Sequence, residues 1–267
     1  MGYRIDTVIT ERFSMDYLKF GSGTKAFVLI PGLSVQSVMG SAAMVAEAYA
    51  QFAKDYTVYL FDRRRGLPAS YSIEEMAEDT AQAIQALGLN DIQLVGASQG
   101  GMISMCIALD HPELVRKLVL CSTCPRANSE AVNTIEHWIA LAREEKAEEL
   151  YLSFGEKVYP KETFEQSRRL IIDLAATVTS EELERFVILA EGIRTFDRYE
   201  DLKGIHCPVL AIGSRDDNVL GAKGTEEIAE QLSGHTEFEQ FMYDGYGHAA
   251  YDLAPDYKNR IEAFLAK

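Results

Sequence analysis

The sequence is poor in cysteine and in positive charge, and it has no long apolar segment. Four cysteines among 267 residues are too few for the disulfide framework of a small secreted protein. Its apolar runs have the length of a strand, so we expect no transmembrane helix. Acidic residues outnumber Lys and Arg by 41 to 26, which gives a net charge of −15. Since such a surface repels phosphate backbones and anionic lipids, we expect neither a nucleic-acid nor a membrane partner.

Signals for a metal, a cofactor or export are also missing from the sequence. Cys121 and Cys124 have C-x-x-C spacing, but no second pair and no paired histidine follows. The five histidines form no metal-binding pattern, and neither a P-loop nor a dinucleotide-binding glycine pattern occurs. The N-terminus lacks the apolar stretch of a signal peptide. We therefore expect a cytoplasmic protein without metal or cofactor. The one basic run, Arg63-Arg64-Arg65, is interpreted as a solvated loop.

What the sequence does contain is a serine between two glycines at the end of a strand. An apolar-leaning stretch over 92–95 runs into Gly96-x-Ser98-x-Gly100, and an apolar stretch without helix breakers follows over 102–109. This pattern is typical of a nucleophile elbow, a sharp strand-to-helix turn whose apex side chain projects free of the sheet. Glycine is needed beside the apex because a Cβ there would collide with its neighbours. Ser98 is thus a candidate nucleophile; an ordinary Gly/Ser turn is the alternative.

A base and an acid for this serine follow further along the chain. A buried-strand pattern over 209–213 leads to Asp216 and Asp217, and an alternating pattern over 238–243 leads to His248. A histidine, with an ordinary pKa near 6.5, can take the proton of a serine hydroxyl at neutral pH. An acid beside it would hold the imidazole tautomer and stabilise the imidazolium. All these candidates follow the carboxyl ends of predicted strands, where α/β proteins place their sites.

The chain order serine, acid, histidine resembles that of the α/β-hydrolase superfamily rather than that of chymotrypsin or subtilisin. The resemblance covers nearly the whole chain. Residues 26–33 resemble the family's oxyanion loop, with Pro31-Gly32 where His-Gly is usual, and residues 111–120 resemble the passage that follows the elbow helix. Residues 62–70 depart from the family pattern by an extra residue and a proline.

The resemblance implies a mechanism and assigns residues to it. In the family the acid usually stands three residues after the glycine that ends its strand, which predicts Asp216 as the partner of His248. The family pattern places the oxyanion-hole donors at the backbone N–H groups of Leu33 and Gln99. Ser98 would attack the substrate, and water would then hydrolyse the acyl-enzyme. No cofactor is implied.

Alternating strands and helices predict an α/β fold with a mostly parallel, doubly wound sheet. This rhythm stops between 128 and 203, where every periodic segment is helical. By resemblance we expect residues 128–203 to form a cap inserted into a core of 1–127 and 204–267. A helical subdomain without a role in substrate binding is the alternative.

The predicted cap suggests which substrates would bind. Its apolar stripes place large side chains on faces that must be buried, and the candidates for substrate binding are Trp138, Ile139, Phe164 and Phe186. Apolar burial contributes about 25 cal/mol per Å², whereas a charged group would lose hydration there. We therefore expect a small-molecule substrate, an uncharged ester with a small-to-medium acyl group.

The predicted function is that of a serine hydrolase of the carboxylesterase kind. Carbon–carbon bond hydrolysis and cofactor-free peroxidation use the same triad, and both stay open. A protein that keeps the pocket only to bind a ligand is a further alternative, which a turnover assay would distinguish. Haloalkane dehalogenases and epoxide hydrolases are disfavoured because they need Asp where this chain has Ser98.

Overall fold

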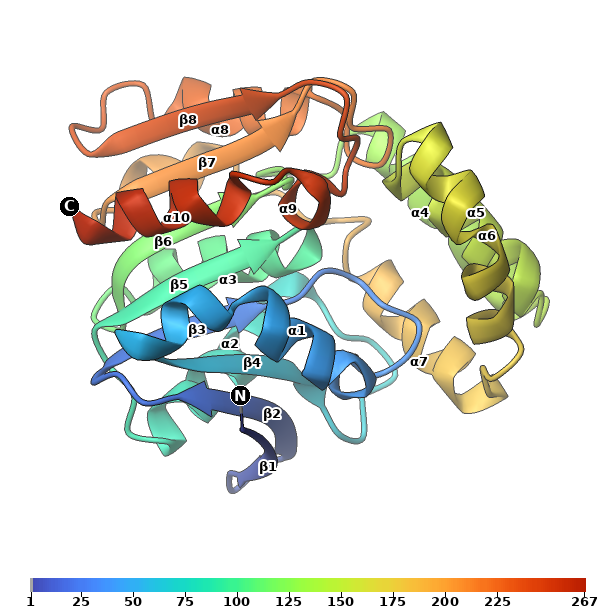
Figure 1. Cartoon of the computed structure of the whole chain (residues 1–267), viewed down its shortest axis with the longest axis horizontal. Helices are drawn as coiled ribbons and strands as arrows, with labels where there is room; N and C mark the ends of the chain where they lie inside the picture. The colour runs from blue at the N-terminus through green and yellow to red at the C-terminus, as the bar shows by residue number, and fades with distance from the viewer. Residues whose placement is uncertain (1) are drawn as a thin grey trace.

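The protein is described by a computed structural model that covers residues 2–267. Its strands form an 8-stranded sheet in the order β1-β2-β4-β3-β5-β6-β7-β8 (Figure 1). β2 runs antiparallel to its neighbours β1 and β4, and the other neighbouring pairs are parallel. The strands are β1 (Tyr3–Ile9), β2 (Ser14–Gly21), β3 (Lys25–Ile30), β4 (Tyr56–Arg64), β5 (Ile92–Ala97), β6 (Val115–Cys121), β7 (Val209–Ser214) and β8 (Phe238–Tyr243).

Helices cover both faces of this sheet. Alternate side chains of a strand point to opposite faces, and here each face carries apolar side chains that pack against helices. In β3, Val28 and Ile30 join one apolar cluster, whereas Phe27 and Leu29 join the other. The first cluster includes α2, α3 and α8, and the second includes α1 and α10 (Figure 1). The predicted α/β fold with a mostly parallel, doubly wound sheet is thereby confirmed. The helices around the sheet are η1 (Val38–Ser41), α1 (Ala42–Ala48), η2 (Ala50–Lys54), α2 (Ile73–Ala86), α3 (Gln99–Asp110), η3 (Glu200–Gly204), α8 (Lys223–Gln231), α9 (Ala250–Leu253) and α10 (Tyr257–Ala266).

Four further helices form an insertion between β6 and β7, within the segment for which the sequence predicts a cap. They stand beside the carboxyl ends of the parallel strands, at the right of Figure 1. The segments that lead into and out of the insertion pair with each other at an isolated antiparallel bridge between Arg126 and Asp197. Its helices are α4 (Ser129–Arg143), α5 (Ala147–Val158), α6 (Lys161–Ala175) and α7 (Ser180–Glu191).

The sequence pattern indicates α4, α6 and α7 but not α5. Helix α7 begins at a capping box in which Thr179 and Glu182 each bond the other's backbone N–H. Helix α5 has no such start, because its N-cap residue Lys146 offers no oxygen to the first turn. It also contains Gly155, which weakens a helix interior. Among residues 2–267, no helix is both long and apolar enough to span a membrane.

Candidate active site

Ser98 occupies the turn between β5 and α3, and its backbone is strained. Its φ is +52° and its ψ is −121°, a conformation that residues other than glycine rarely adopt. A Cβ on Gly96 would overlap the carbonyl oxygen of Gly100, and one on Gly100 would overlap that of Ile30. Strain of this kind costs on the order of 1–3 kcal/mol and persists only where the surroundings enforce it. The turn has the predicted elbow geometry, with Ser98 at its apex.

His248 is buried and hydrogen-bonded to an aspartate. Its Nδ1 lies 2.8 Å from Oδ2 of Asp217. Since a carboxylate oxygen only accepts, Nδ1 carries the proton and Nε2 is left with a free lone pair. The other oxygen of Asp217 accepts the backbone N–H groups of Val219 and Leu220, at 2.8 and 3.0 Å. Burial raises the pKa of Asp217, but the interaction with His248 and the two N–H groups outweigh it and hold the pKa below its ordinary value.

The prediction of Asp216 as the partner of His248 is wrong. Asp216 is exposed, and its Oδ1 accepts the hydroxyl of Ser214 and the N–H of Gly245, at 2.6 and 3.0 Å. Its Oδ2 accepts the N–H of Gly247 at 3.0 Å. Asp216 therefore fastens the loop that carries His248, whereas Asp217 contacts the imidazole itself. The family's usual spacing misleads here because successive side chains of this turn point in different directions.

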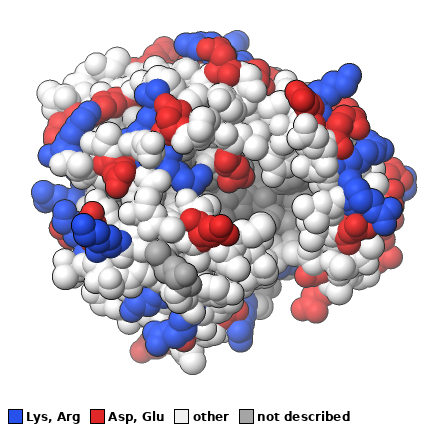
Figure 2. All heavy atoms as spheres, in the orientation of Figure 1, with Lys and Arg blue, Asp and Glu red and all other residues white. Residues whose placement is uncertain are grey.

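Ser98 and His248 line the same cavity, which has a volume of about 150 Å³. The cavity lies between the carboxyl ends of the strands and the insertion, and Figure 2 shows a hollow between the two parts of the molecule. No Asp, Glu, Lys or Arg lines it. The helices of the insertion contribute four apolar side chains, with Trp138 stacked on Phe154 at a centroid distance of 4.4 Å. These four are Ile135, Trp138, Phe154 and Val158, and Ile193, just after α7, adds a fifth.

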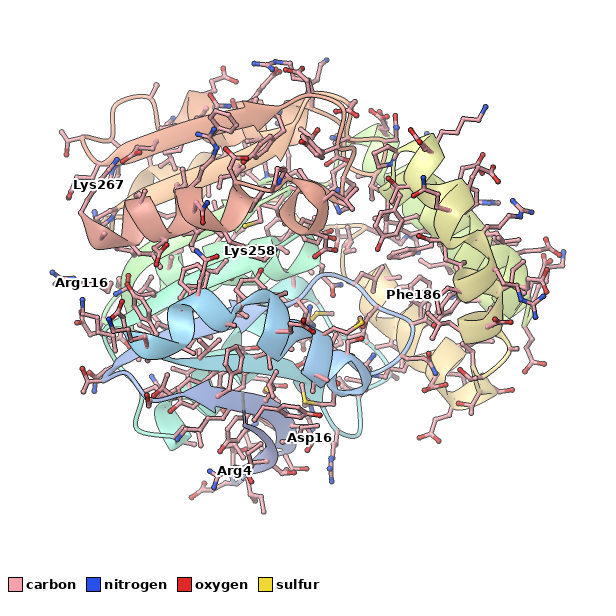
Figure 3. All side chains as sticks on the ribbon, in the orientation of Figure 1. Arg4, Asp16, Arg116, Phe186, Lys258 and Lys267 are labelled. Atoms are coloured by element: carbon pink, nitrogen blue, oxygen red, sulfur yellow. The ribbon has the colours of Figure 1, made fainter. Side chains whose placement is uncertain are left out.

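Of the four predicted substrate-binding residues, Trp138 lines the Ser98 cavity and the other three do not. Ile139, Phe164 and Phe186 are buried within the insertion instead. Phe164 packs against the backbone of Gly155 in α5, and Phe186 belongs to α7, which contacts α4 (Figure 3). The sequence missed Phe154 and Val158 because it gave no signal for α5. An apolar face predicted for a helix does not show which of its buried side chains face the sheet and which pack against other helices of the insertion.

Both predicted oxyanion-hole residues lie close to Ser98. Gln99 is the first residue of α3, where a backbone N–H has no partner within its own helix. Leu33 lines the cavity, and the preceding Gly32 is so close that an added Cβ would lie 3.2 Å from the Cβ of Ser98. Within residues 2–267 the N–H groups of Leu33 and Gln99 have no hydrogen-bond partner. The positive end of the α3 dipole also points at this position.

Arg63 fixes the positions of Pro31 and Gln99 beside Ser98 through hydrogen bonds. The sequence did not reveal this role of Arg63. Its guanidinium donates to the carbonyl of Pro31 at 2.8 Å and to the side-chain oxygen of Gln99 at 3.0 Å. The amide nitrogen of Gln99 in turn donates to the carbonyl of Leu189 in α7, at 2.7 Å. Arg63 is buried, which lowers its pKa to about 10. The interpretation of the arginine run as a solvated loop is therefore wrong for Arg63, although Arg65 is exposed.

In the described part of the chain, no group of three or more His, Cys, Asp or Glu residues is arranged to hold a metal ion. Cys121 and Cys124 are both buried and free. Burial raises the pKa of the Cys121 thiol to about 12 and that of Cys124 still further. Neither thiol has the low pKa of a reactive cysteine.

A family model described as alpha/beta hydrolase fold matches residues 25–255. The match covers most of the chain, and the protein therefore belongs to the α/β-hydrolase family. This confirms the resemblance on which the site residues were assigned.

Curated relatives named carbamate hydrolase RutD match most of the chain. The protein from Rhizobium rhizogenes is 26% identical over 250 residues, which covers 90% of this chain and 92% of that protein. Among solved structures, MGS-M2, an alpha/beta hydrolase enzyme from a Medee basin deep-sea metagenome library, has a TM-score of 0.87 at 19% identity and covers 98% of both chains. The enol-lactonase from Burkholderia xenovorans LB400 has a TM-score of 0.84 at 17% identity, covering 98% of this chain and 100% of that one. The structural likeness shows the shared fold, and the family and the curated relatives support a hydrolase.

Proposed function

We propose that the protein is a serine hydrolase that cleaves a small-to-medium, largely uncharged ester through an acyl-enzyme. The observation that carries this proposal is that Ser98, on its strained turn, lines one cavity with His248, whose Nδ1 is bound to Asp217. In the proposed mechanism Nε2 of His248 takes the serine proton as Oγ attacks the ester carbonyl. Asp217 holds the tautomer and stabilises the imidazolium that forms.

The negative charge on the tetrahedral oxygen needs donors that are already in place. The N–H groups of Leu33 and Gln99 are assigned to this role, and one such donor contributes about 3 kcal/mol to lowering the barrier. His248 then gives its proton to the leaving alcohol. A water molecule attacks the acyl-enzyme in the same way and releases the acid and Ser98.

The cavity supports the assignment of a small, uncharged acyl group. Its volume of about 150 Å³ matches the size of cavity that holds benzene. A charge placed inside this cavity would lose its hydration against these mostly apolar walls without gaining a partner. In this proposal residues 128–203 act as a cap over a core of 1–127 and 204–267, and the cap limits the length of the acyl chain.

A panel of p-nitrophenyl esters from acetate to palmitate tests this proposal, with a carboxylate-bearing ester as the charged control. We expect kcat/KM to be highest for short and medium chains, and turnover to fall by several orders of magnitude in Ser98→Ala. A maximum at palmitate, or a preference for the carboxylate ester, contradicts the proposed substrate class. Tight binding without turnover of any ester would favour a ligand-binding protein.

A carbamate is the second candidate substrate, because curated relatives named carbamate hydrolase match this chain, two of them at 25–26% identity over 86–90% of it. A carbamate presents the same carbonyl to Ser98 but has a less electrophilic carbon. Matched p-nitrophenyl carbamates and esters of equal length separate the two. A higher kcat/KM for the carbamate would make it the preferred class.

A further inference from the structure

A second, larger pocket adjoins the Ser98 cavity. It has a volume of about 570 Å³ and lies between the loop that follows β3 and helices α5, α6 and α7. In Figure 1 this blue loop reaches toward α7 and the rest of the insertion. The two cavities share four wall residues and therefore lie next to each other. The shared residues are Leu33, Ser34, Val38 and Phe154.

A directed chain of hydrogen bonds forms the polar side of this pocket. The hydroxyl of Tyr151 donates to the side-chain oxygen of Gln36 at 3.1 Å. The amide nitrogen of Gln36 donates to the two carboxylate oxygens of Glu182 at 3.3 and 3.4 Å. Burial, with the charge of Glu182, raises the pKa of Tyr151 to about 12, so its hydroxyl keeps its proton. The amide nitrogen of Gln36 also donates to the hydroxyl oxygen of Thr177 at 3.5 Å, so its two protons both have acceptors within the protein. The carboxylate oxygens of Glu182 can only accept hydrogen bonds.

The two carboxylate oxygens of Glu182 accept different numbers of hydrogen bonds. Oε2 accepts the backbone N–H and the hydroxyl of Thr179 in the capping box, at 2.9 and 3.2 Å. Oε1 accepts only the bond of 3.3 Å from Gln36. A carboxylate oxygen can accept more than one hydrogen bond, so Oε1 has room for a further donor.

The charge of Glu182 is not balanced by a neighbouring cation. Glu182 forms no ion pair within residues 2–267, and no Lys or Arg lines either cavity. Arg185, one turn further along α7, is held by Asp62 at 2.6 Å. Beside Glu182 the pocket therefore offers hydrogen-bond acceptors and negative charge, which disfavour a carboxylate there.

We propose that the pocket bounded by Glu182, Gln36 and Tyr151 binds the part of the substrate remote from the scissile bond. It selects a group that donates a hydrogen bond, a hydroxyl or an ammonium, over an alkyl, ether or carboxylate group. The assignment of the scissile bond to Ser98 rests on the proposed function. The selection itself rests on the contacts of Glu182 and its two partners.

The test uses p-nitrophenyl esters whose acyl chains have equal length but different ends. The ω-hydroxyhexanoate and ω-aminohexanoate carry donors, the ω-methoxypentanoate carries only an acceptor, and the heptanoate carries neither. We expect kcat/KM to favour both donors over the other two by about tenfold in the wild type. In Glu182→Gln the amino ester should lose most of its advantage, because the amide oxygen still accepts but carries no charge.

A matched variant controls for the capping role of Glu182. Gln also serves in a capping box, so the start of α7 is retained in Glu182→Gln. Glu75 has the same capping role at the start of α2, where it accepts the N–H of Ser72 at 2.7 Å, but it lies outside both cavities. Glu75→Gln should therefore keep the tenfold ratio of the wild type. An equal loss of the ratio in both variants overturns the proposal.

A measurement without turnover separates this proposal from the proposed function. The affinities of the corresponding four anilides for Ser98→Ala, measured by calorimetry, should show the same order and the same response to Glu182→Gln. If the protein binds the donor-bearing anilides more tightly but turns over no ester, the proposed esterase activity is wrong and the proposed donor selectivity of the pocket is supported. The opposite outcome is turnover that depends on Ser98 but shows equal kcat/KM and equal affinity for donor and alkyl chains. It would overturn the proposed donor selectivity of the pocket and would support the esterase activity.

Discussion

Asp217 and His248 are joined by a hydrogen bond of 2.8 Å between Oδ2 and Nδ1, across the loops that follow β7 and β8. The two side chains are nearly inaccessible to solvent, which strengthens an electrostatic interaction. The neighbouring Asp216 binds the backbone of the loop that carries His248. One aspartate therefore contacts the imidazole, and the other fixes the position of its loop.

This division predicts different effects for the two aspartates. Asp217→Asn should lose on the order of 10⁴ in kcat, because the amide favours the wrong imidazole tautomer. Asp216→Asn should lose far less kcat and should instead lower Tm, since it weakens the bonds to Gly245 and Gly247. Steady-state kinetics on one ester and thermal unfolding of both variants check this. The opposite ranking in kcat would return the orienting role to Asp216.

The stability of the protein should depend on pH through Asp216. Burial raises the pKa of Asp216, but the Ser214 hydroxyl and the backbone N–H groups of Gly247 and Gly245 lower it below its ordinary value near 3.9. A group whose pKa is lower in the folded than in the unfolded state stabilises the folded protein at pH values above its unfolded pKa. This contribution to stability disappears as the pH falls through the folded-state pKa. The difference in unfolding free energy between wild type and Asp216→Asn should be constant between about pH 5 and 7 and shrink below about pH 4. Urea denaturation across this range measures it; a difference that grows toward acid contradicts the assignment.

The ion pair of Arg185 and Asp62 should contribute to stability, because it joins α7 to the end of β4 in a largely buried position. Removing one partner of a buried pair costs about 3 kcal/mol or more. One nitrogen of Arg185 is buried without a partner, so we expect the lower end of this range for Arg185→Met. The exposed ion pair of Arg169 with Asp173 in the same insertion is a matched control. Such an exposed pair contributes less than about 1 kcal/mol to the unfolding free energy. Similar losses of unfolding free energy in Arg185→Met and Arg169→Met would contradict this role.

Phe154 should limit the length of the acyl chain, because it lines both cavities. Phe154→Ala should shift the maximum of kcat/KM toward longer esters. Phe164→Ala is the control: that ring is buried in the insertion but lines neither cavity, so this variant should lose about 3 kcal/mol of stability without changing the preferred chain length. A shift in both variants would mean that loosening of the insertion, rather than the wall at Phe154, sets the preference.

The parts of the site that the sequence revealed are those encoded by neighbouring residues. Ser98 stands in a pattern in which glycines, strand and helix all lie within a short segment, and His248 lies in the short loop that follows β8. The choice between Asp216 and Asp217 depends on the direction of two adjacent side chains in a turn, which no local pattern encodes. Phe154 lies on α5, which has neither a side-chain cap nor an uninterrupted interior. Arg63 is buried only because Pro31 and Gln99, distant in sequence, supply its partners.

Every step of the proposed mechanism depends on Ser98 as the nucleophile, and covalent labelling of this serine needs no substrate. A fluorophosphonate probe reacts with an activated serine hydroxyl, and mass spectrometry of the digested protein locates the adduct. We expect a single adduct on Ser98 in the wild type and none in Ser98→Ala. Asp217→Asn should react far more slowly than Asp216→Asn, because labelling needs the same proton transfer to His248. Labelling that persists in Ser98→Ala, or that appears on another residue of the wild type, would contradict the account.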